Sequence, residues 1–248
     1  MWDAGQYEKF RAERTRPFFD LLSRIPDRSY KSIVDLGCGT GDLTAAIADH
    51  WPEARVIGVD NSDEMLKAAA EHADPGRIDF VKDDIATWKP AQPVELIVAN
   101  ASFHWIPDHD QLLARMAAAL GPKGVLAVQM PANFQSPSHL LLQETVAGRV
   151  ALRHDIVLPM ATYVDLLHGL GFHADAWETL YQHVLQGKDA VLEWVKGTAL
   201  RPVLKALQGP ERDEFLAAYA AKLRAAYPET PSGTLFPFRR VFFVAAKR

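Results

Sequence analysis

Glycines and acidic residues follow three short stretches of the chain that are rich in β-branched residues. The groups are Val34-Asp35-Leu36-Gly37-Cys38-Gly39-Thr40-Gly41-Asp42, then Asp60-Asn61, then Asp84-Ile85. Glycines in a turn let the backbone approach a ligand closely, and a carboxylate after the next strand can accept hydrogen bonds from a ribose diol. Asp84 could receive an adenine amino group while the Ile85 N–H serves a ring nitrogen. These groups predict a nucleoside-binding site.

The spacing of the glycines discriminates between classes of nucleotide site. The dinucleotide fingerprint is Gly-x-Gly-x-x-Gly/Ala, whereas here Gly41 comes one position early and Asp42 occupies the place of the small residue. An acidic group at a helix start also disfavours a pyrophosphate there. No Gly-Lys-Ser/Thr follows, which excludes a P-loop. We therefore expect a nucleoside-like ligand without phosphates.

Alternating strands and helices must position these residues. Continuous apolar runs predict buried parallel strands around 33–34 and over 55–59, 78–81, 94–98 and 125–128, with helices over 42–51, 62–72 and 108–120 between them. This alternation is typical of a doubly wound α/β sheet. After Met130 the pattern predicts helices over 138–151, 160–170, 189–207 and 210–227, and strands over 175–184 and 240–245. Late helices of this kind usually cover the edge of the sheet where ligands bind.

Composition removes several classes of function. The 248 residues carry 27 Lys and Arg against 31 Asp and Glu, a net charge of −4 without runs of like charge, so no nucleic-acid partner is expected. No apolar run of about 18 residues predicts a membrane span, and the start does not look like a secretory signal. The single cysteine, Cys38, suits a reducing cytoplasm and is interpreted as a small filler of the loop.

The three groups together resemble the cofactor signature of the Rossmann-like class I S-adenosylmethionine-dependent methyltransferases. The DLGCGTG loop, Asp60 and Asp84-Ile85 carry this likeness. It implies a single domain with a seven-stranded, mostly parallel sheet, helices on both faces and an inserted helical cap. The implied parts are N-terminal lid helices over 1–30, a cofactor-binding core over 31–130, cap helices with the sixth strand over 131–239, and a last antiparallel strand over 240–248.

Further segments narrow the resemblance within that family. WDAGQYEKFRAERTRP, VANASFHWIPDH, VLAVQMP, TALRPVL and FPFRRVFFVA resemble members that esterify trans-aconitate, a small tricarboxylate, with S-adenosylhomocysteine as the other product. The resemblance implies a cytoplasmic enzyme, a monomer or weak homodimer, without a metal. The alternatives are a different small carboxylic acid as acceptor, a nicotinamide oxidoreductase on the same fold, or a module that binds the nucleoside without catalysis.

Carboxylate chemistry makes specific demands on the remaining residues. A carboxylate is already ionised at neutral pH, so no general base is needed, and Asn100-Ala101-Ser102-Phe103 replaces the Asn/Asp-Pro-Pro-Tyr/Phe motif typical of amine methylation. Three carboxylates, roughly −3 in charge at pH 7, require cations, and guanidinium groups bind carboxylates bidentately. The arginines available in the later half are Arg149, Arg153, Arg201, Arg239 and Arg240. We favour Arg201 and Arg240, with Arg149 as a third candidate; the alternative is that they are surface cations or ion pairs.

Other residues are assigned by position. His104 and Trp105 follow the fourth strand and are expected to position the substrate, His104 by donating to a carboxylate and Trp105 by excluding water. Asn100 is a cofactor candidate, whereas Asp35 either contacts the cofactor or only orients the loop. Tyr7 and Arg14 lie about two helical turns apart and could close over the cofactor, with Arg14 or Arg16 pairing with its carboxylate.

One acidic and histidine-rich segment superficially resembles a metal site. It contains His104, Asp108, His109 and Asp110, but Pro107 interrupts it. Asp108 is better interpreted as an N-cap, which makes His109 an exposed residue at a helix start. We therefore expect no metal.

Overall fold

The computed structural model describes residues 11–152 and 156–248, with side chains from residue 15 onward. In these residues one sheet has the strand order β3-β2-β1-β4-β5-β8-β6, and β7 pairs with β8 outside this path. The strands are β1 Ser32–Leu36, β2 Arg55–Asp60, β3 Ile78–Lys82, β4 Val94–Asn100, β5 Leu120–Pro131, β6 Phe172–Leu185, β7 Glu229–Thr230 and β8 Gly233–Lys247. The α/β class is confirmed, with eight strands where seven were expected because the two-residue β7 forms an extra antiparallel pair.

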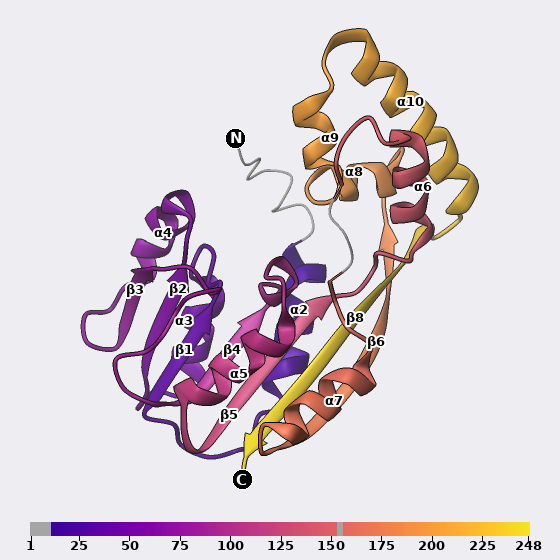
Figure 1. The fold of residues 1–248 in the computed structure, drawn as a ribbon. Helices are drawn as coiled ribbons and strands as arrows, with labels where there is room; N and C mark the ends of the chain where they lie inside the picture. Colours follow the sequence, from indigo (N-terminus) through magenta and orange to yellow (C-terminus); the bar gives the residue numbers. More distant parts are fainter. Residues whose placement is uncertain (1–10, 153–155) are drawn as a thin grey trace. The chain divides into compact units, whose positions relative to one another are not determined.

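Parallel pairing brings the predicted ligand residues to one edge. β1 pairs with β2 on one side and with β4 on the other, so successive strands are added in both directions from β1. Ligands bind at such a switch point, outside the carboxyl ends of the strands. Leu36 lies opposite Val59, which places the glycine loop beside Asp60. β4 and β5 continue the parallel sheet, whereas the arrow of β8 points opposite to that of β5 (Figure 1).

Helices cover the sheet and form a second group late in the chain. They are α2 Arg11–Leu22, α3 Asp42–His50, α4 Asp63–Ala69, η1 Ala70–His72, η2 Phe103–Trp105, α5 His109–Ala119, α6 Pro137–Val146, α7 Met160–Gly169, α8 Ala190–Lys196, α9 Arg201–Ala206 and α10 Gly209–Ala226. α3 packs on β2 and β3, α5 on β5, and α7 against α5. Ser62 caps α4, because its hydroxyl accepts a hydrogen bond from the Met65 N–H at 3.3 Å.

The chain divides into two compact units. The sheet unit comprises residues 16–131, 156–178 and 241–248, and the helical unit includes residues 132–152 and 179–240. The long strands β6 and β8 contribute residues to both (Figure 1). In the helical unit, α6, α8, α9 and α10 bury a core around Trp194, Leu200, Tyr219 and Phe236.

Three predicted boundaries in the later half are wrong. The helix expected over 189–207 is two helices, because Pro202 has no N–H to continue the hydrogen bonds of α8 and is tolerated only in the first turn of α9. α6 ends at Val146, since Ala147 adopts a left-handed φ of 48°. The last strand begins at Gly233, seven residues before the predicted start, because β7 and β8 form a hairpin.

Candidate active site

The glycine loop joins β1 to α3 and exposes its backbone at the middle glycine. Gly37 has a φ of 81°, and a Cβ there would come within 2.4 Å of the Ser102 Cβ. Gly41, with a φ of 82°, is the N-cap of α3. By contrast, a Cβ at Gly39 would meet no atom of the described residues within 4 Å. The loop therefore packs tightly at Gly37 and leaves space for another molecule at Gly39.

Asp60 ends β2 and holds the loop from the side. Its Oδ2 accepts a hydrogen bond from the Gly39 N–H at 3.0 Å, and its Oδ1 accepts one from the Ser62 N–H at 2.9 Å. A carboxylate has about four lone-pair sites, so these two bonds fix its orientation and leave acceptor capacity for a diol. Asn61 follows directly and is exposed.

The turn after β3 supplies the third group. The Asp84 Oδ1 accepts a hydrogen bond from the Ala86 N–H at 2.8 Å, and the Asp84 carbonyl accepts from Trp88. Ile85 lies between these contacts, and in the described residues its own N–H has no acceptor. The Ile85 Cδ1 lies 3.4 Å from where a Cβ on Gly37 would stand. The ends of the first and third strands thus approach one another.

The end of β4 presents an amide with unused hydrogen-bonding capacity. The Asn100 Oδ1 is buried and has no hydrogen-bond partner in the part of the chain that the structure describes. Two residues on, the Ser102 hydroxyl donates to the Leu36 carbonyl at 2.6 Å, directly before Gly37. A buried acceptor without a donor costs free energy, which suggests a ligand donor for Asn100.

Two buried ionisable groups, one at the end of β1 and one in the glycine loop, have shifted pKa values. Burial raises the pKa of Asp35 to about 6, although the Thr44 hydroxyl, which donates to its Oδ2 at 2.6 Å, partly opposes the shift. Asp35 therefore binds a side chain of α3. Burial and, secondarily, the nearby carboxylates of Asp35 and Asp60 raise the pKa of the Cys38 thiol far above its usual range. Such a thiol is a poor nucleophile, consistent with its interpretation as a filler.

The segment after β4 differs from the prediction at two residues. His104 is buried and Trp105 is 59% exposed, with their ring centroids 4.9 Å apart. Asp108 precedes α5 in a left-handed conformation, with a φ of 55°, and its side chain makes no capping hydrogen bond. His109 is 4% exposed, not solvent-facing as expected, because its ring hydrogen-bonds to Tyr163 and to the Phe103 carbonyl. Nothing in the spacing of the sequence indicated the Tyr163 contact.

The candidate arginines lie in the helical unit in three different environments. Arg149 donates to the Val146 and Thr145 carbonyls and lies 3.6 Å from the Glu211 carboxylate, contacts that favour the structural alternative. Arg201 is exposed at the start of α9 and forms no ion pair among the described residues. Arg240 is 5% exposed, and its guanidinium carbon lies 4.9 Å from the centre of the Phe238 ring.

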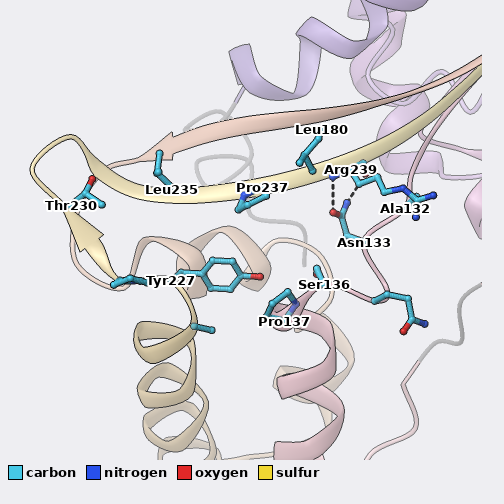
Figure 2. A pocket seen from close by; sticks show the side chains of 13 residues that line it. Ala132, Asn133, Ser136, Pro137, Leu180, Tyr227, Thr230, Leu235, Pro237 and Arg239 are labelled. Atoms are coloured by element: carbon cyan, nitrogen blue, oxygen red, sulfur yellow. Dashed lines mark hydrogen bonds between the residues drawn. The ribbon is translucent and has the colours of Figure 1, made fainter.

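A pocket of about 530 Å³ also lies in the helical unit. Its walls include Leu180, Leu235 and Pro237, and Arg239 is the charged residue at its border. Figure 2 shows the Asn133 amide beside the Arg239 backbone, to which it donates at 2.9 Å and from which it accepts at 2.8 Å. These mostly apolar walls do not suit a tricarboxylate, so we assign the pocket no role in the predicted reaction.

Several remaining candidates lie wholly or partly outside the described residues. Tyr7 lies outside the described residues, as does Arg153. Arg14 lies in α2, but its side chain is also outside them. Arg16 lies 4.0 Å from the Asp20 carboxylate one turn further along α2.

The described residues contain neither a helix suited to span a membrane nor a cluster suited to bind a metal. None of the helices there is long and apolar enough to cross a membrane. No group of three or more His, Cys, Asp or Glu residues in this part of the chain is arranged to hold a metal ion.

Comparisons with known proteins extend this picture. The profile of a methyltransferase domain family matches residues 33–124. A trans-aconitate 2-methyltransferase of Streptomyces avermitilis is 50% identical, covering 99% of this chain and 97% of the relative. One of Azoarcus sp. is 47% identical, covering 99% of each chain. A solved phosphoethanolamine N-methyltransferase 2 of Haemonchus contortus, in complex with S-adenosylhomocysteine, shares the fold with a TM-score of 0.57 at 20% identity, covering 94% of this chain and 52% of that one.

The strand order, the glycine loop and the profile match define a class I methyltransferase domain. The full-length relatives are more specific, because their identity extends through the helical unit as well as the sheet unit. The chain belongs to the family of the trans-aconitate 2-methyltransferases.

Proposed function

We propose that the protein transfers a methyl group from S-adenosylmethionine to one carboxylate of trans-aconitate, giving a monomethyl ester and S-adenosylhomocysteine. The observation that carries the donor assignment is the Asp60 carboxylate, oriented by two backbone N–H groups beside the open space at Gly39. The acceptor assignment rests on the relatives' names over nearly the full chain. The alternative is another small carboxylic acid bound by the same helical unit.

The residues at the end of the sheet fit the donor one by one. Asp60 would accept from the ribose diol, and the Ile85 N–H and the Asp84 carboxylate would bind the adenine edge. The Asn100 Oδ1, which has no partner among the described residues, is suited to accept a hydrogen bond from the ammonium group of the methionyl part. Gly37, Gly39 and Gly41 would place backbone against the ligand. Asp35, which accepts a hydrogen bond from Thr44, would orient the glycine loop without contacting the ligand.

Once bound, S-adenosylmethionine supplies a methyl group already activated by a positively charged sulfur. The nucleophile is a carboxylate, ionised at neutral pH, so no residue has to remove a proton. The protein instead fixes the two reactants and excludes water; such positioning can lower a barrier by roughly 7–11 kcal/mol. His104 and Trp105 are assigned this task at the end of β4, where His104 would donate to a substrate carboxylate.

Arg201 and Arg240 are assigned to the two carboxylates that do not react. Strong donors on the attacking oxygen would hold back its lone pair, because its charge is neutralised as the new bond forms. Guanidinium groups on the other two carboxylates offset the cost of removing them from water. Arg149 stays a candidate only if it exchanges its contacts with Glu211 and the end of α6. The N-terminal Tyr7 and Arg14 are assigned to a lid over the donor.

We further propose that the enzyme works in the cytoplasm on a free small molecule, as a monomer or weak homodimer, without nucleic acid, membrane or metal. Because an ester no longer resembles the tricarboxylates of central metabolism, the reaction would detoxify an inhibitor of an aconitate-handling enzyme.

The test measures methyl transfer to trans-aconitate beside citrate, isocitrate and a fatty acid, with the ester identified by mass spectrometry. Turnover of trans-aconitate above the others is expected, and no activity on any tricarboxylate would remove the proposal. Thermal shifts with S-adenosylhomocysteine and with NAD(P) separate it from an oxidoreductase.

A further inference from the structure

A buried hydrogen-bonded group holds the turn that carries His104 and Trp105. The turn η2 follows β4 directly, after Ala101, whose φ of 52° is uncommon for a residue with a Cβ. The Phe103 carbonyl oxygen accepts two hydrogen bonds, one from the Ile106 N–H at 2.9 Å and one from the His109 Nε2 at 3.0 Å. The imidazole therefore fixes the residue immediately before His104.

The other side of the imidazole ring is held equally firmly. The His109 Nδ1 lies 2.5 Å from the Tyr163 hydroxyl oxygen, and that hydroxyl accepts a hydrogen bond from the Leu158 N–H at 3.1 Å. Because the Phe103 carbonyl can only accept, the His109 Nε2 must carry a proton. In the neutral ring Nδ1 is then the acceptor, and the Tyr163 hydroxyl donates to it. Burial lowers the pKa of His109, which favours this neutral form.

The residue that precedes Phe103 is joined to the glycine loop. The Ser102 hydroxyl donates to the Leu36 carbonyl at 2.6 Å, and Gly37 packs directly on the Ser102 side chain. The turn is thus fixed on one side to the loop proposed to bind the donor and on the other to α5 and α7. His104 and Trp105 lie along the chain between Ser102, which is held by the glycine loop, and His109, whose ring is held by the Phe103 carbonyl and by Tyr163. They therefore have little freedom to move relative to the methyl donor.

We propose that His109 and Tyr163 are positioning residues for the methyl transfer. They set the place of His104 and Trp105, on the acceptor side, relative to the glycine loop on the donor side. This inference rests on the proposed function, because that function assigns the acceptor to this turn. The hydrogen bond from the Leu158 N–H to the Tyr163 hydroxyl links these two residues to the segment where the chain returns from the helical unit to the sheet unit.

The first test compares kcat, KM for trans-aconitate and the dissociation constant of S-adenosylhomocysteine in H109A, H109Q and Y163F. The glutamine amide reaches about as far as Nε2 and can keep the donor to the Phe103 carbonyl. We expect kcat to fall about 10- to 100-fold in H109A, since small misplacements near the reacting atoms are costly. H109Q should recover most of this loss in kcat, and the kcat of Y163F should fall about fivefold. The dissociation constant of S-adenosylhomocysteine should stay within about twofold of the wild-type value in all three variants.

Y30F is the matched control, because Tyr30 is also 1% exposed in the sheet unit and donates to a backbone carbonyl, that of Pro26. It should lose stability as Y163F does and keep its kcat. Equal kcat losses in H109Q and H109A, or a dissociation constant that rises as kcat falls, would overturn the inference. If H109A does not fold, the kcat values of H109Q and Y163F, compared with that of Y30F, test the inference.

The second test does not depend on the acceptor. Hydrogen exchange over residues 101–107, with S-adenosylhomocysteine bound, should be about tenfold faster in H109A or Y163F than in the wild type and H109Q, because local order limits exchange. Unchanged exchange in both variants would overturn the inference. Absence of tricarboxylate turnover in the wild type, with exchange altered as expected, would instead remove the proposed function and leave the fixed turn in place.

Discussion

The sheet unit and the helical unit hold their candidate residues by different kinds of contact. In the sheet unit, Asp60 accepts hydrogen bonds from the backbone N–H groups of Gly39 and Ser62, and Asp84 accepts one from the N–H two residues further on. In the helical unit, Arg149 and Arg240 are held by side-chain and helix-end contacts. The topology of the sheet therefore positions the cofactor-binding residues, whereas Arg149 and Arg240 depend on local side-chain contacts in the helical unit.

The largest expected effect tests the sheet side of this comparison. Asp60→Ala removes the carboxylate from both the Gly39 N–H and the proposed ribose contact, so the affinity for S-adenosylhomocysteine should fall at least about 100-fold, a loss of roughly 3 kcal/mol. Isothermal titration calorimetry measures it. Asp60→Asn keeps one acceptor oxygen, so its affinity for S-adenosylhomocysteine should lie between those of the wild type and Asp60→Ala.

Asp79→Ala is the control for that change. Asp79 is also a strand carboxylate, but it pairs with Arg55 at the surface at 2.9 Å. Its removal should leave cofactor affinity unchanged, since exposed pairs contribute little. Equal affinity in Asp60→Ala and the wild type would show that the ribose assignment is wrong.

The second prediction tests the helical side. Arg201→Ala and Arg240→Ala should each raise the KM for trans-aconitate about 10- to 100-fold, because a hydrogen bond to a charged group contributes about 1.5–3 kcal/mol. The dissociation constant of S-adenosylhomocysteine should not change. Steady-state kinetics with calorimetry separates the two effects.

Arg240 needs a second variant because it is buried. Arg240→Lys keeps a charge and part of the packing on Phe238, and should lose binding with a smaller loss of stability. Arg212→Ala is the surface control in α10, where Arg212 lies 4.0 Å from Asp213. If the two arginine variants match Arg212→Ala in KM, the helical unit does not bind the acceptor through them.

The same contrast explains how much the sequence could predict. β2 was located correctly because an apolar run marks a strand of the buried sheet, and the register of β1 against β2 then puts Asp60 beside the loop. His109 was misplaced because its burial depends on Tyr163, 54 positions away, which no local pattern shows. Pro202 did carry a local signal for the break between α8 and α9, but the apolar periodicity masked it.

A third prediction concerns pH and stability, at Asp35. Its folded pKa, about 6, is raised above the ordinary value of 3.8, so between these values the folded state holds a proton that the unfolded state has released. The unfolding free energy should therefore fall as pH rises from about 4 to about 6, by about 2–3 kcal/mol. Urea unfolding of the wild type and Asp35→Asn, compared at several pH values, isolates this contribution, because the asparagine variant cannot titrate. A difference that does not vary with pH would contradict it.

The smallest expected effect is at Cys38, which shares the loop with the donor residues and yet should be chemically silent. Burial and the Asp35 and Asp60 carboxylates raise the pKa of its thiol, so almost no thiolate exists at neutral pH to react. Labelling of the native protein by a disulfide reagent should proceed only as fast as the loop opens, and Cys38→Ala should keep kcat within about twofold, since no bond to the thiol is formed or broken. Rapid labelling that saturating S-adenosylhomocysteine fails to slow would mean that this loop is open in solution. In that case the backbone hydrogen bonds of the sheet unit would not hold the cofactor site in a single conformation.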